Sequence, residues 1–391
     1  MRSNVAWPRR ALGEIADLQI GRTPPRAEPK YWGPGHPWLS IADMNQGRDL
    51  TATKETITDA AVRECNCRSI PAGTVVMSFK LSIGKVGVTT HDMFTNEAIA
   101  AVRIKRPNEF NTGYLYHALR SLDFDGIGET AVKGVTLNLG SLTSLKIPAP
   151  PYDVQQRIAQ VLDKADAIRR RRRESLRLLD EFLRSAFLEM FGDPVRNEKG
   201  WNVKPLGELA DFVGGGTPSR AVSAYFTGQV CWATAKDIQS ENVIDTQEHI
   251  TSEAIQNSAT KVVRPGTILI VVKSKVLMHR LPVAIAQVPT CFGQDLKGIV
   301  LRSGLSPTYV ARHLRLGQSW FLNRARGANT EGLTLDHLRR FPVMLPPSDL
   351  IERYDQVERK YRETNKAFAT HIEHSDALFD SLAQRAFRGE L

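Results

Sequence analysis

The sequence predicts an α+β protein made of two homologous, strand-rich domains joined by two long helices, which form an antiparallel coiled coil with a pseudo-two-fold axis. Three observations lead to this fold class: an internal duplication, short β-branched runs between Gly- and Pro-rich turns, and two long stretches with heptad spacing. The predicted boundaries are a first domain at 1–150, a central helix at 151–192, a second domain at 193–346 and a C-terminal helix at 347–391.

The duplication is visible in a motif that occurs twice. Leu12-Gly13-Glu14-Ile15-Ala16-Asp17 recurs as Leu206-Gly207-Glu208-Leu209-Ala210-Asp211. With small drifts in offset, further residues pair in the same order: Gly21 with Gly215, Thr23-Pro24 with Thr217-Pro218, Tyr31 with Tyr225, Trp38 with Trp232, Gly73-Thr74 with Gly266-Thr267, Tyr114 with Tyr309, and Pro150-Pro151 with Pro346-Pro347. One ancestral unit written twice, with small loop insertions, explains this order.

Within each copy, β-branched runs predict strands and helical stretches are fewer. The runs Val75-Val76-Met77 and Ile268-Leu269-Ile270-Val271 lie between turn residues, and helices are expected at 114–122 and 309–321. Each domain is therefore predicted to have a strand-rich α+β core.

After each Pro-Pro pair, the apolar spacing changes to alternating fours and threes. Proline, Asp153 and Asp349 suit the helix starts, and Gly192 and Gly389 mark the ends. Because the chain must leave the first helix, build a domain and return, antiparallel pairing is the simplest closure. The predicted seam consists of Val154, Ile158, Val161, Ile168, Leu179, Phe182, Leu350, Tyr354, Val357, Tyr361, Phe368, Leu378 and Leu382.

Composition favours a polyanionic partner and argues against several other classes. The net charge is +10, which suits phosphate neutralisation. A cytoplasmic location is expected, because no apolar run reaches the roughly 18 residues of a membrane span and the first residues lack a secretory core. The four cysteines form no CxxC or His-supported zinc pattern, so no metal site is predicted.

Motifs of catalysis are imitated but incomplete, so no catalytic residue and no bound cofactor are predicted. One imitation is Ala149-Pro150-Pro151-Tyr152, which has alanine where amino-methyltransferases place a hydrogen-bond acceptor. Another is Phe212-Val213-Gly214-Gly215-Gly216, which imitates a loop that binds S-adenosylmethionine, but its repeat mate lacks two glycines. Ile83-Gly84-Lys85-Val86 lacks the remaining residues of a phosphate loop. His279, His337, His371 and His374 have no nucleophile or carboxylate partner by spacing.

Polar residues that follow the central strand of each domain are the candidates for DNA contact. Lys and Arg suit guanine edges and phosphates, while Ser and His add hydrogen bonds; the alternative is a solvated turn. With the arginines of the Gly-Thr-Pro turns, the candidates are Arg22, Ser78, Lys80, Ser82, Lys85, Arg220, Lys273, Ser274, Lys275, His279 and Arg280.

The densest positive charge is the run from Arg169 to Arg173 in the first long helix. It suits a DNA clamp, but a solvated coiled-coil face or a site for an acidic partner explains it as well.

In this order, and doubled, a set of short motifs is specific to one family. They are Leu12-Gly13-Glu14 with Gly21-Arg22-Thr23-Pro24, Gly73-Thr74-Val75-Val76-Met77-Ser78-Phe79-Lys80, Thr95-Asn96-Glu97-Ala98-Ile99, Leu145-Lys146-Ile147-Pro148, Phe187-Leu188-Glu189-Met190-Phe191-Gly192-Asp193-Pro194 and Arg385-Ala386-Phe387-Arg388-Gly389-Glu390-Leu391. Over essentially its whole length, the chain resembles the specificity subunit of type I restriction-modification systems.

The resemblance implies two target-recognition domains, held apart by the two helices, that each read one half of a bipartite, asymmetric sequence in double-stranded DNA. It implies no catalytic residues. Methylation of adenine N6 with S-adenosylmethionine is expected from two modification subunits. ATP- and Mg²⁺-dependent translocation and cleavage are expected from two restriction subunits, which attach through the modification subunits.

Two other functions remain open at this level. A self-sufficient N6-adenine DNA methyltransferase requires an acceptor at position 149 and a working cofactor loop. A scaffold whose coiled coil joins proteins, with domains that bind something other than DNA, requires neither.

Overall fold

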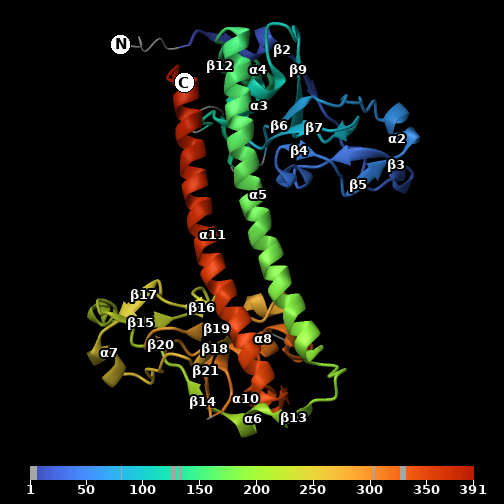
Figure 1. Ribbon diagram of the computed structural model, residues 1–391. Helices are drawn as coiled ribbons and strands as arrows, with labels where there is room; N and C mark the ends of the chain where they lie inside the picture. Colours follow the sequence, from blue (N-terminus) through green and yellow to red (C-terminus); the bar gives the residue numbers. More distant parts are fainter. Residues whose placement is uncertain (1–6, 81, 125–128, 132–133, 303, 326–331) are drawn as a thin grey trace. The chain divides into compact units, whose positions relative to one another are not determined.

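The computed structural model describes residues 7–80, 82–124, 129–131, 134–302, 304–325 and 332–391, with the backbone alone at 129–131 and 134–136. The chain divides into two compact units (Figure 1): unit 1 contains residues 1–174 and 370–391, and unit 2 contains residues 175–369. This division differs from the predicted domain boundaries, because it runs through both long helices. Half of each helix therefore belongs to each unit.

Unit 1 is built on two sheets that share no strand. In its described part, a five-stranded sheet has the order β2-β9-β6-β7-β4 and a three-stranded sheet has the order β5-β3-β8. A short antiparallel pair, β1-β12, precedes the long helix. The strands are β1 (Arg9–Ala11), β2 (Ala16–Ile20), β3 (Trp32–Leu39), β4 (Asp49–Leu50), β5 (Glu55–Ile57), β6 (Val75–Ser78), β7 (Val86–Thr89), β8 (Phe94–Thr95), β9 (Ile99–Ile104), β10 (Glu129–Ala131), β11 (Gly134–Thr136) and β12 (Lys146–Pro148).

Unit 2 repeats these three sheets in the same strand order, which confirms the predicted duplication, whereas the antiparallel pair β10-β11 of unit 1 has no counterpart among the described strands of unit 2. In its described part the orders are β14-β21-β18-β19-β16, β17-β15-β20 and β13-β22. The strands are β13 (Asn202–Pro205), β14 (Ala210–Gly214), β15 (Val230–Ala233), β16 (Asn242–Val243), β17 (Glu248–Ile250), β18 (Ile268–Val271), β19 (Val283–Ala286), β20 (Thr290–Phe292), β21 (Leu296–Leu301) and β22 (Pro342–Leu345).

Several of the shorter helices also correspond between the copies. Asn111 and Ser306 cap α3 and α8 by accepting hydrogen bonds from the backbone N–H of Tyr114 and Tyr309. The shorter helices are α1 (Leu12–Ile15), η1 (Pro29–Tyr31), η2 (Asp43–Gln46), α2 (Asp59–Glu64), α3 (Thr112–Arg120), α4 (Leu139–Ser144), α6 (Leu206–Leu209), η3 (Ser223–Phe226), α7 (Ser252–Gln256), η4 (Lys275–Met278), α8 (Pro307–Leu316), α9 (Gln318–Leu322) and α10 (Leu335–Arg340).

One predicted helix is interrupted. The sequence predicts a single helix over 309–321, whereas the structure has α8 and α9 separated by Gly317. A Cβ atom at Gly317 would lie 2.7 Å from the ring of Phe341. The backbone at Gly317 therefore packs so close to this ring that a side chain at the junction of the two helices would collide with it.

The long helices are α5 (Tyr152–Phe191) and α11 (Ser348–Arg388). Each ends, as predicted, at a glycine with positive φ, 84° at Gly192 and 83° at Gly389.

The two long helices pack antiparallel in each unit. In unit 1, Arg169 lies over the ring of Phe379 at 4.2 Å, and Arg173 pairs with Asp376 at 2.7 Å. In unit 2, the Tyr361 hydroxyl donates to Asp180, while the rings of Phe187 and Tyr354 meet edge to face at 5.4 Å. Later residues of α5 thus meet earlier residues of α11, as predicted.

The buried face of these helices differs from the predicted heptad seam. Of the predicted residues, Ile158, Tyr354 and Tyr361 are buried and Val154, Val161, Leu179, Leu350, Val357, Phe368 and Leu382 are half-buried. Ile168, Phe182 and Leu378 are 51%, 58% and 57% exposed, so they are not seam residues within their units.

Buried charge explains the displaced seam. Asp166 and Arg169 take buried positions on α5 and pair with each other at 2.6 Å. A pattern based on apolar residues passes over them, although a paired charge satisfies the requirement for burial.

Both long helices belong to the cores of both units. Leu162 and Phe379 are buried in the core of unit 1, and Phe187 and Tyr354 in that of unit 2. Each domain is therefore fixed to an antiparallel helix pair by side chains from both helices.

Candidate nucleic-acid interface

The end of β6 and the loop that joins it to β7 contain four of the predicted DNA-contacting residues. Ser78 is buried at the end of β6, where its hydroxyl donates to the carbonyl of Ser82 and accepts from the backbone N–H of Lys85 at 3.1 Å. Ser78 thus closes the loop, and its predicted role in DNA contact is replaced by a structural one. Ser82 is exposed, and the ammonium of half-buried Lys80 lies 5.3 Å from the ring of Phe79.

Lys85 lies at a strongly cationic cavity of unit 1. Its ammonium donates to the side chain of Asn45 at 2.8 Å and to the carbonyl of Ile41 at 3.4 Å. The cavity has a volume of about 410 Å³, and Asp166 is the acidic residue of its lining. The cationic lining residues are Arg48, Lys85, Arg120, Arg169, Arg170 and Arg173. The fold therefore brings the predicted loop lysine together with the arginine run of α5.

The arginine run is largely engaged within unit 1. Arg170 pairs with Asp49 at 2.9 Å, Arg172 donates to the carbonyl of His371 at 2.6 Å, and Arg173 pairs with Asp376. Burial alone would raise the pKa of Asp166, but hydrogen bonding and charge from Arg169 and its neighbours hold that pKa below its usual value. The main role of the run is therefore to join the two helices and the domain. The same arginines also contribute positive charge to the lining of the cavity.

The corresponding loop of unit 2, between β18 and β19, contains a short helix, η4. Ser274 caps this helix by accepting from the backbone N–H of Val276 at 3.3 Å, so its hydroxyl has a structural role. The side chains of Lys273, Lys275 and His279 are exposed. Arg280, also exposed, donates to the side chain of Gln239 at 2.8 Å.

The two loops thus occupy equivalent places and present different side chains. Both follow the central strand of the five-stranded sheet, since β6 and β18 hold the same position in the strand order. This is the divergence that the sequence predicts.

Arg220 is an exposed residue that packs on an aromatic module of unit 2. Its guanidinium pairs bidentately with Glu248 and lies 4.3 Å from the ring of Phe226 and 5.1 Å from that of Trp232. The hydrogen bonds from Arg220 hold the pKa of Glu248 below its usual value. These contacts give Arg220 a structural role, and its predicted DNA contact stays a prediction.

Unit 1 repeats the module with a residue that the sequence reasoning missed. Arg26 pairs with Glu55 and lies 3.9 Å and 4.9 Å from the rings of Trp32 and Trp38. The offset of the duplication, applied to Arg220, was the available signal. Arg22, the residue predicted instead, is exposed and its backbone carbonyl accepts from the indole of Trp38 at 2.9 Å.

A polar interlock ties the domain of unit 1 to its helix. Asp163 of α5 accepts from Arg48, just before β4, at 2.6 Å and bonds His117 of α3 at 2.7 Å. Burial would raise the pKa of Asp163, yet His117 and Arg48 keep it below its usual value.

The interlock of unit 2 joins the corresponding elements through different charges. Arg312 of α8 pairs with Glu241, just before β16, at 2.8 Å and with Glu358 of α11 at 3.5 Å. The hydroxyl of Tyr354 also donates to Glu358 at 3.1 Å. Burial raises the pKa of Glu358 against the opposing effect of Arg312.

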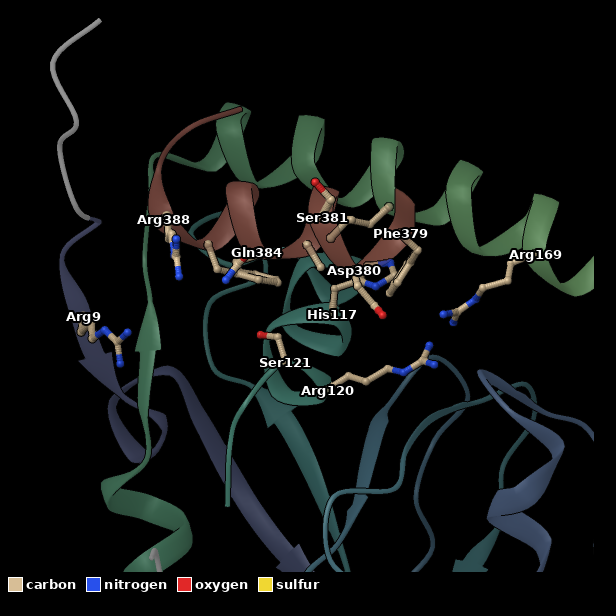
Figure 2. A pocket seen from close by; sticks show the side chains of 13 residues that line it. Arg9, His117, Arg120, Ser121, Arg169, Phe379, Asp380, Ser381, Gln384 and Arg388 are labelled. Atoms are coloured by element: carbon tan, nitrogen blue, oxygen red, sulfur yellow. The ribbon is translucent and has the colours of Figure 1, made fainter. Parts of the chain in front are cut away.

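A second cavity of unit 1, of about 720 Å³, lies where α3 meets both long helices (Figure 2). Arg9, Arg120, Arg169 and Arg388 line it against Asp380. The cavity also meets His117, whose Nδ1 has no hydrogen-bond partner within the described residues. This balance of charge favours an anionic group.

The glycine-rich segment that imitates a cofactor loop has a structural purpose. Phe212, Val213 and Gly214 belong to β14, and a Cβ atom at Gly215 would lie 2.1 Å from the carbonyl oxygen of Gly293. Its repeat mate Gly21 is packed as closely, with a Cβ position 2.2 Å from the carbonyl of Thr95. The glycines therefore allow the chain to pass close to a neighbouring loop.

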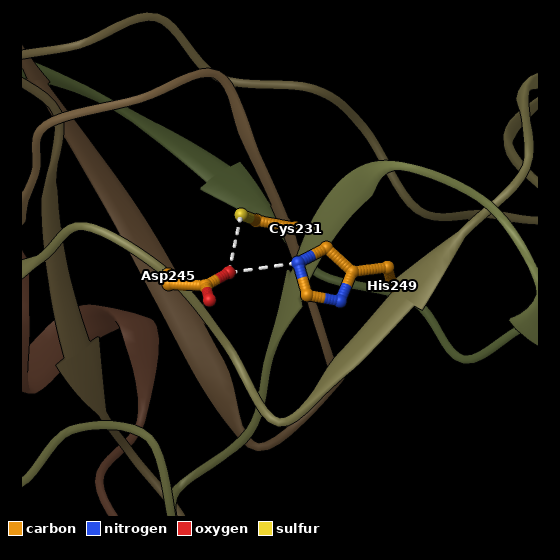
Figure 3. Close-up of side chains that lie close together, drawn as sticks. All are labelled: Cys231, Asp245 and His249. Atoms are coloured by element: carbon orange, nitrogen blue, oxygen red, sulfur yellow. Dashed lines mark hydrogen bonds and ion pairs between the residues drawn. The ribbon is translucent and has the colours of Figure 1, made fainter.

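Unit 2 also brings together three potential metal ligands. Cys231, Asp245 and His249 have their ligand atoms within 4.8 Å of one another (Figure 3). The sequence reasoning missed this cluster, because strand pairing creates it.

Within the parts of the chain that the structure describes, no helix is long and apolar enough to cross a membrane.

Comparison with known proteins identifies both copies. The sequence model of the type I restriction modification DNA specificity domain matches residues 4–178 and again residues 198–357. The MjaIX specificity subunit of Methanocaldococcus jannaschii, a type I restriction enzyme subunit, is 23% identical over 283 residues, which cover 67% of this chain and 65% of that protein. The EcoR124I/EcoR124II specificity subunit of Escherichia coli is 27% identical over 230 residues, 56% of each chain. The matches thus span less than two thirds of these relatives.

Solved structures share the fold over nearly the whole chain. The S subunit of a type I restriction-modification system from M. genitalium aligns with a TM-score of 0.62 and 13% identity, covering 99% of this chain and 97% of that one. A chain from a structure of type I R-M complex assembly and conformational transition aligns with a TM-score of 0.56 and 18% identity, covering 99% and 98%.

Proposed function

Because the chain belongs to the type I restriction modification DNA specificity domain family, we propose that it is the specificity subunit of such a system. Its role is to recognise double-stranded DNA, while catalysis belongs to other subunits. The observation that carries this proposal is the matched pair of domains, alike in framework and different in the loops after β6 and β18.

Each domain reads one half of a bipartite site. Exposed Lys275 and His279 in unit 2, and exposed Ser82 in unit 1, are available for base edges. Since these loops carry different donors, the two half-sites differ in sequence.

The cationic cavity beside Lys85 takes a backbone phosphate rather than a base. Six cations surround a space of about 410 Å³, and positively charged side chains supply the sequence-independent part of DNA binding. The domain of unit 1 is thereby positioned on the duplex while its loops read the bases.

The long helices set the spacer between half-sites and dock the modification subunits. At 40 and 41 residues, each is about 60 Å long. Leu178 and Phe182, four positions apart on one face of α5, are 51% and 58% exposed. Exposed apolar side chains at this spacing suit a protein partner.

The proposed complex contains two modification subunits and two restriction subunits, the latter attached through the former. S-adenosylmethionine, ATP and Mg²⁺ bind these partners. In support, the imitated cofactor motifs are explained by close backbone packing at Gly215 and by the turn into α5.

The direct test is to map methylated adenines in DNA from cells that express this chain with its neighbouring subunits. The expected result is one split, asymmetric target, with no methylation by the purified chain alone. The variant His279→Ala should change the preference in one half-site and leave the other unchanged. Methyl transfer by the isolated chain, or binding of S-adenosylmethionine to it in calorimetry, would overturn the proposal.

Docking is tested by Phe182→Asp in the full chain. The charged side chain should weaken co-purification with the modification subunit, while thermal stability stays near that of the wild type because the position is exposed. Ile244→Asp is the matched control, since Ile244 is 72% exposed in the domain of unit 2, outside the long helices. Equal loss of binding in both variants would contradict docking on α5.

A further inference from the structure

The three residues of the cluster in Figure 3 come together through strand register. Cys231 of β15 lies directly opposite His249 of β17 in the antiparallel pair. Asp245 comes from the turn before β17, four residues ahead of His249. Directly opposed residues of antiparallel strands have their Cβ atoms about 5 Å apart, so both side chains reach the same point.

The side chains of Cys231 and His249 converge on one oxygen atom of Asp245. The Oδ1 of Asp245 accepts from the Cys231 thiol at 3.7 Å, bonds His249 Nε2 at 2.7 Å and accepts from the backbone N–H of Thr246 at 2.9 Å. Asp245 bridges the thiol and the imidazole, so the imidazole does not stand between the two others as it does in a catalytic triad.

The surroundings hold this geometry in place. The hydroxyl of buried Thr246 accepts from the backbone N–H of Trp232 at 3.0 Å and donates to the carbonyl of Glu248 at 2.7 Å. The turn that carries Asp245 is thereby fastened to β15 on one side and to β17 on the other.

We propose that Cys231, Asp245 and His249 bind a divalent transition-metal ion of the zinc class, with a fourth position open to water. Thiolate, imidazole and carboxylate together suit Zn²⁺, whereas Mg²⁺ and Ca²⁺ require oxygen ligands. With zinc distances of about 2.3 Å to sulfur and about 2.0 Å to nitrogen and oxygen, a tetrahedron needs ligand separations of roughly 3.3 to 3.6 Å. The sulfur–oxygen and oxygen–nitrogen distances of 3.7 Å and 2.7 Å approach this through a small shift of exposed Asp245.

Charge and protons balance in this site. The thiolate and the carboxylate neutralise the two positive charges of the ion. Zinc binds the thiolate form of cysteine, so the Cys231 sulfur must give up its proton. The incoming ion displaces that proton, and His249 must present its Nε2 lone pair, with its proton on Nδ1. Metal affinity should therefore increase with pH, with about one proton released per ion.

The equivalent positions of unit 1 have no such ligands. In the pairing of β3 with β5, Pro37 and Thr56 stand where unit 2 has Cys231 and His249. Since the rest of the small sheet is alike, unit 1 serves as a control within the same molecule. The ion should fix the β15–β17 pair and leave β3 and β5 unaffected.

The test uses the untagged full chain, stripped of metal by chelation and then titrated with Co²⁺ and Zn²⁺. Co²⁺ should give a thiolate-to-metal charge-transfer absorption that saturates at one equivalent, and Zn²⁺ should displace it. Hydrogen exchange of residues 230–250 should slow when Zn²⁺ binds, while that of residues 32–57 should not change.

The ligand variants are Cys231→Ser and His249→Gln, and the matched control is Cys291→Ser. Cys291 is a buried thiol on the neighbouring strand β20 and lies outside the cluster. Each ligand variant should weaken metal binding by more than about 100-fold, since loss of an outer-shell contact alone costs 10- to 100-fold. His249 is half-exposed, so its variant retains the fold and keeps the test decisive even if Cys231→Ser unfolds. Absence of the charge-transfer band in the wild type, or its loss in Cys291→Ser with retention in His249→Gln, would overturn the proposal.

Discussion

The interlock of unit 2 predicts that the substitution Arg312→Met lowers the stability of the fold by a large amount that depends on pH. This substitution removes the guanidinium that Glu241 and Glu358 share, while retaining most of the side-chain volume. Glu358 is buried and is left with Arg362 at 3.7 Å and the hydroxyl of Tyr354. Removing one partner of a buried ion pair costs about 3 to 5 kcal/mol, and Arg362 places this case near 3 kcal/mol. For a unit of this size, 1 kcal/mol corresponds to about 2 to 4 °C, so the melting temperature should fall by about 6 to 12 °C.

The pH dependence of that loss has a definite sign. Burial already raises the pKa of Glu358 above its unfolded value, and removal of Arg312 raises it further. A carboxyl with a raised folded pKa favours the folded state at low pH, and this advantage disappears as the pH rises through the folded pKa. The difference in stability between wild type and variant should therefore be larger at pH 8 than at pH 5.

Calorimetry of the full chain at pH 5 and pH 8, together with hydrogen exchange of α8, measures the loss of stability and its pH dependence. Arg312→Met with Glu358→Gln should recover most of the lost stability, because no unpaired charge remains buried. Arg340→Met is the matched control, since Arg340 forms an exposed pair with Asp336 at 2.9 Å that is expected to contribute under about 1 kcal/mol. A loss as small as that of the control, or no rescue by Glu358→Gln, would refute the reasoning.

Three further predictions concern DNA. Lys85→Gln should reduce the slope of log affinity against log salt concentration by about 1, as expected for one lost phosphate contact. Lys146→Gln, at an exposed lysine outside the cavity, should leave that slope unchanged. Equal slopes for both variants would place the phosphate elsewhere. His279→Ala should reduce discrimination at one base pair by about 1 to 3 kcal/mol in competition binding, and uniform weakening on every sequence would indicate a backbone contact instead. Insertion of four residues after Glu174 and four after Ala369 lengthens both helices by about 6 Å, so the preferred spacer found by methylation mapping should increase. An unchanged spacer would contradict the proposal that the long helices set it.

The sequence was sufficient to predict features that depend on local patterns. The duplication, the strands after Gly73 and Gly266, and the helix ends at Gly192 and Gly389 follow from residue order, β-branched runs and positive φ. The signals for strands and helix ends lie within a few residues of the structure that they specify, and the duplication is read from the order of such local motifs.

Features that depend on tertiary contacts were not accessible in this way. Asp166 and Arg169 are buried in the helix pair because each satisfies the other, which no apolar pattern indicates. Ser78 and Arg220 have residue types that suit DNA. In the fold, however, the Ser78 hydroxyl bonds within its own loop and the Arg220 guanidinium packs on two aromatic rings. The spacing of Cys231 and His249 likewise gives no sign that the two are cross-strand partners.

The interlocks explain how the two copies can diverge in specificity while keeping a common geometry. In unit 1 the bridging charge is on the long helix, where Asp163 joins Arg48 and His117. In unit 2 it has moved to the domain, where Arg312 joins Glu241 and Glu358. The edge strand, the short helix and the long helix correspond between the copies, and the connection between these elements has been retained while its charges changed. Because the loops after β6 and β18 contribute no residue to either interlock, new side chains there alter what a domain reads without loosening its hold on the helix pair.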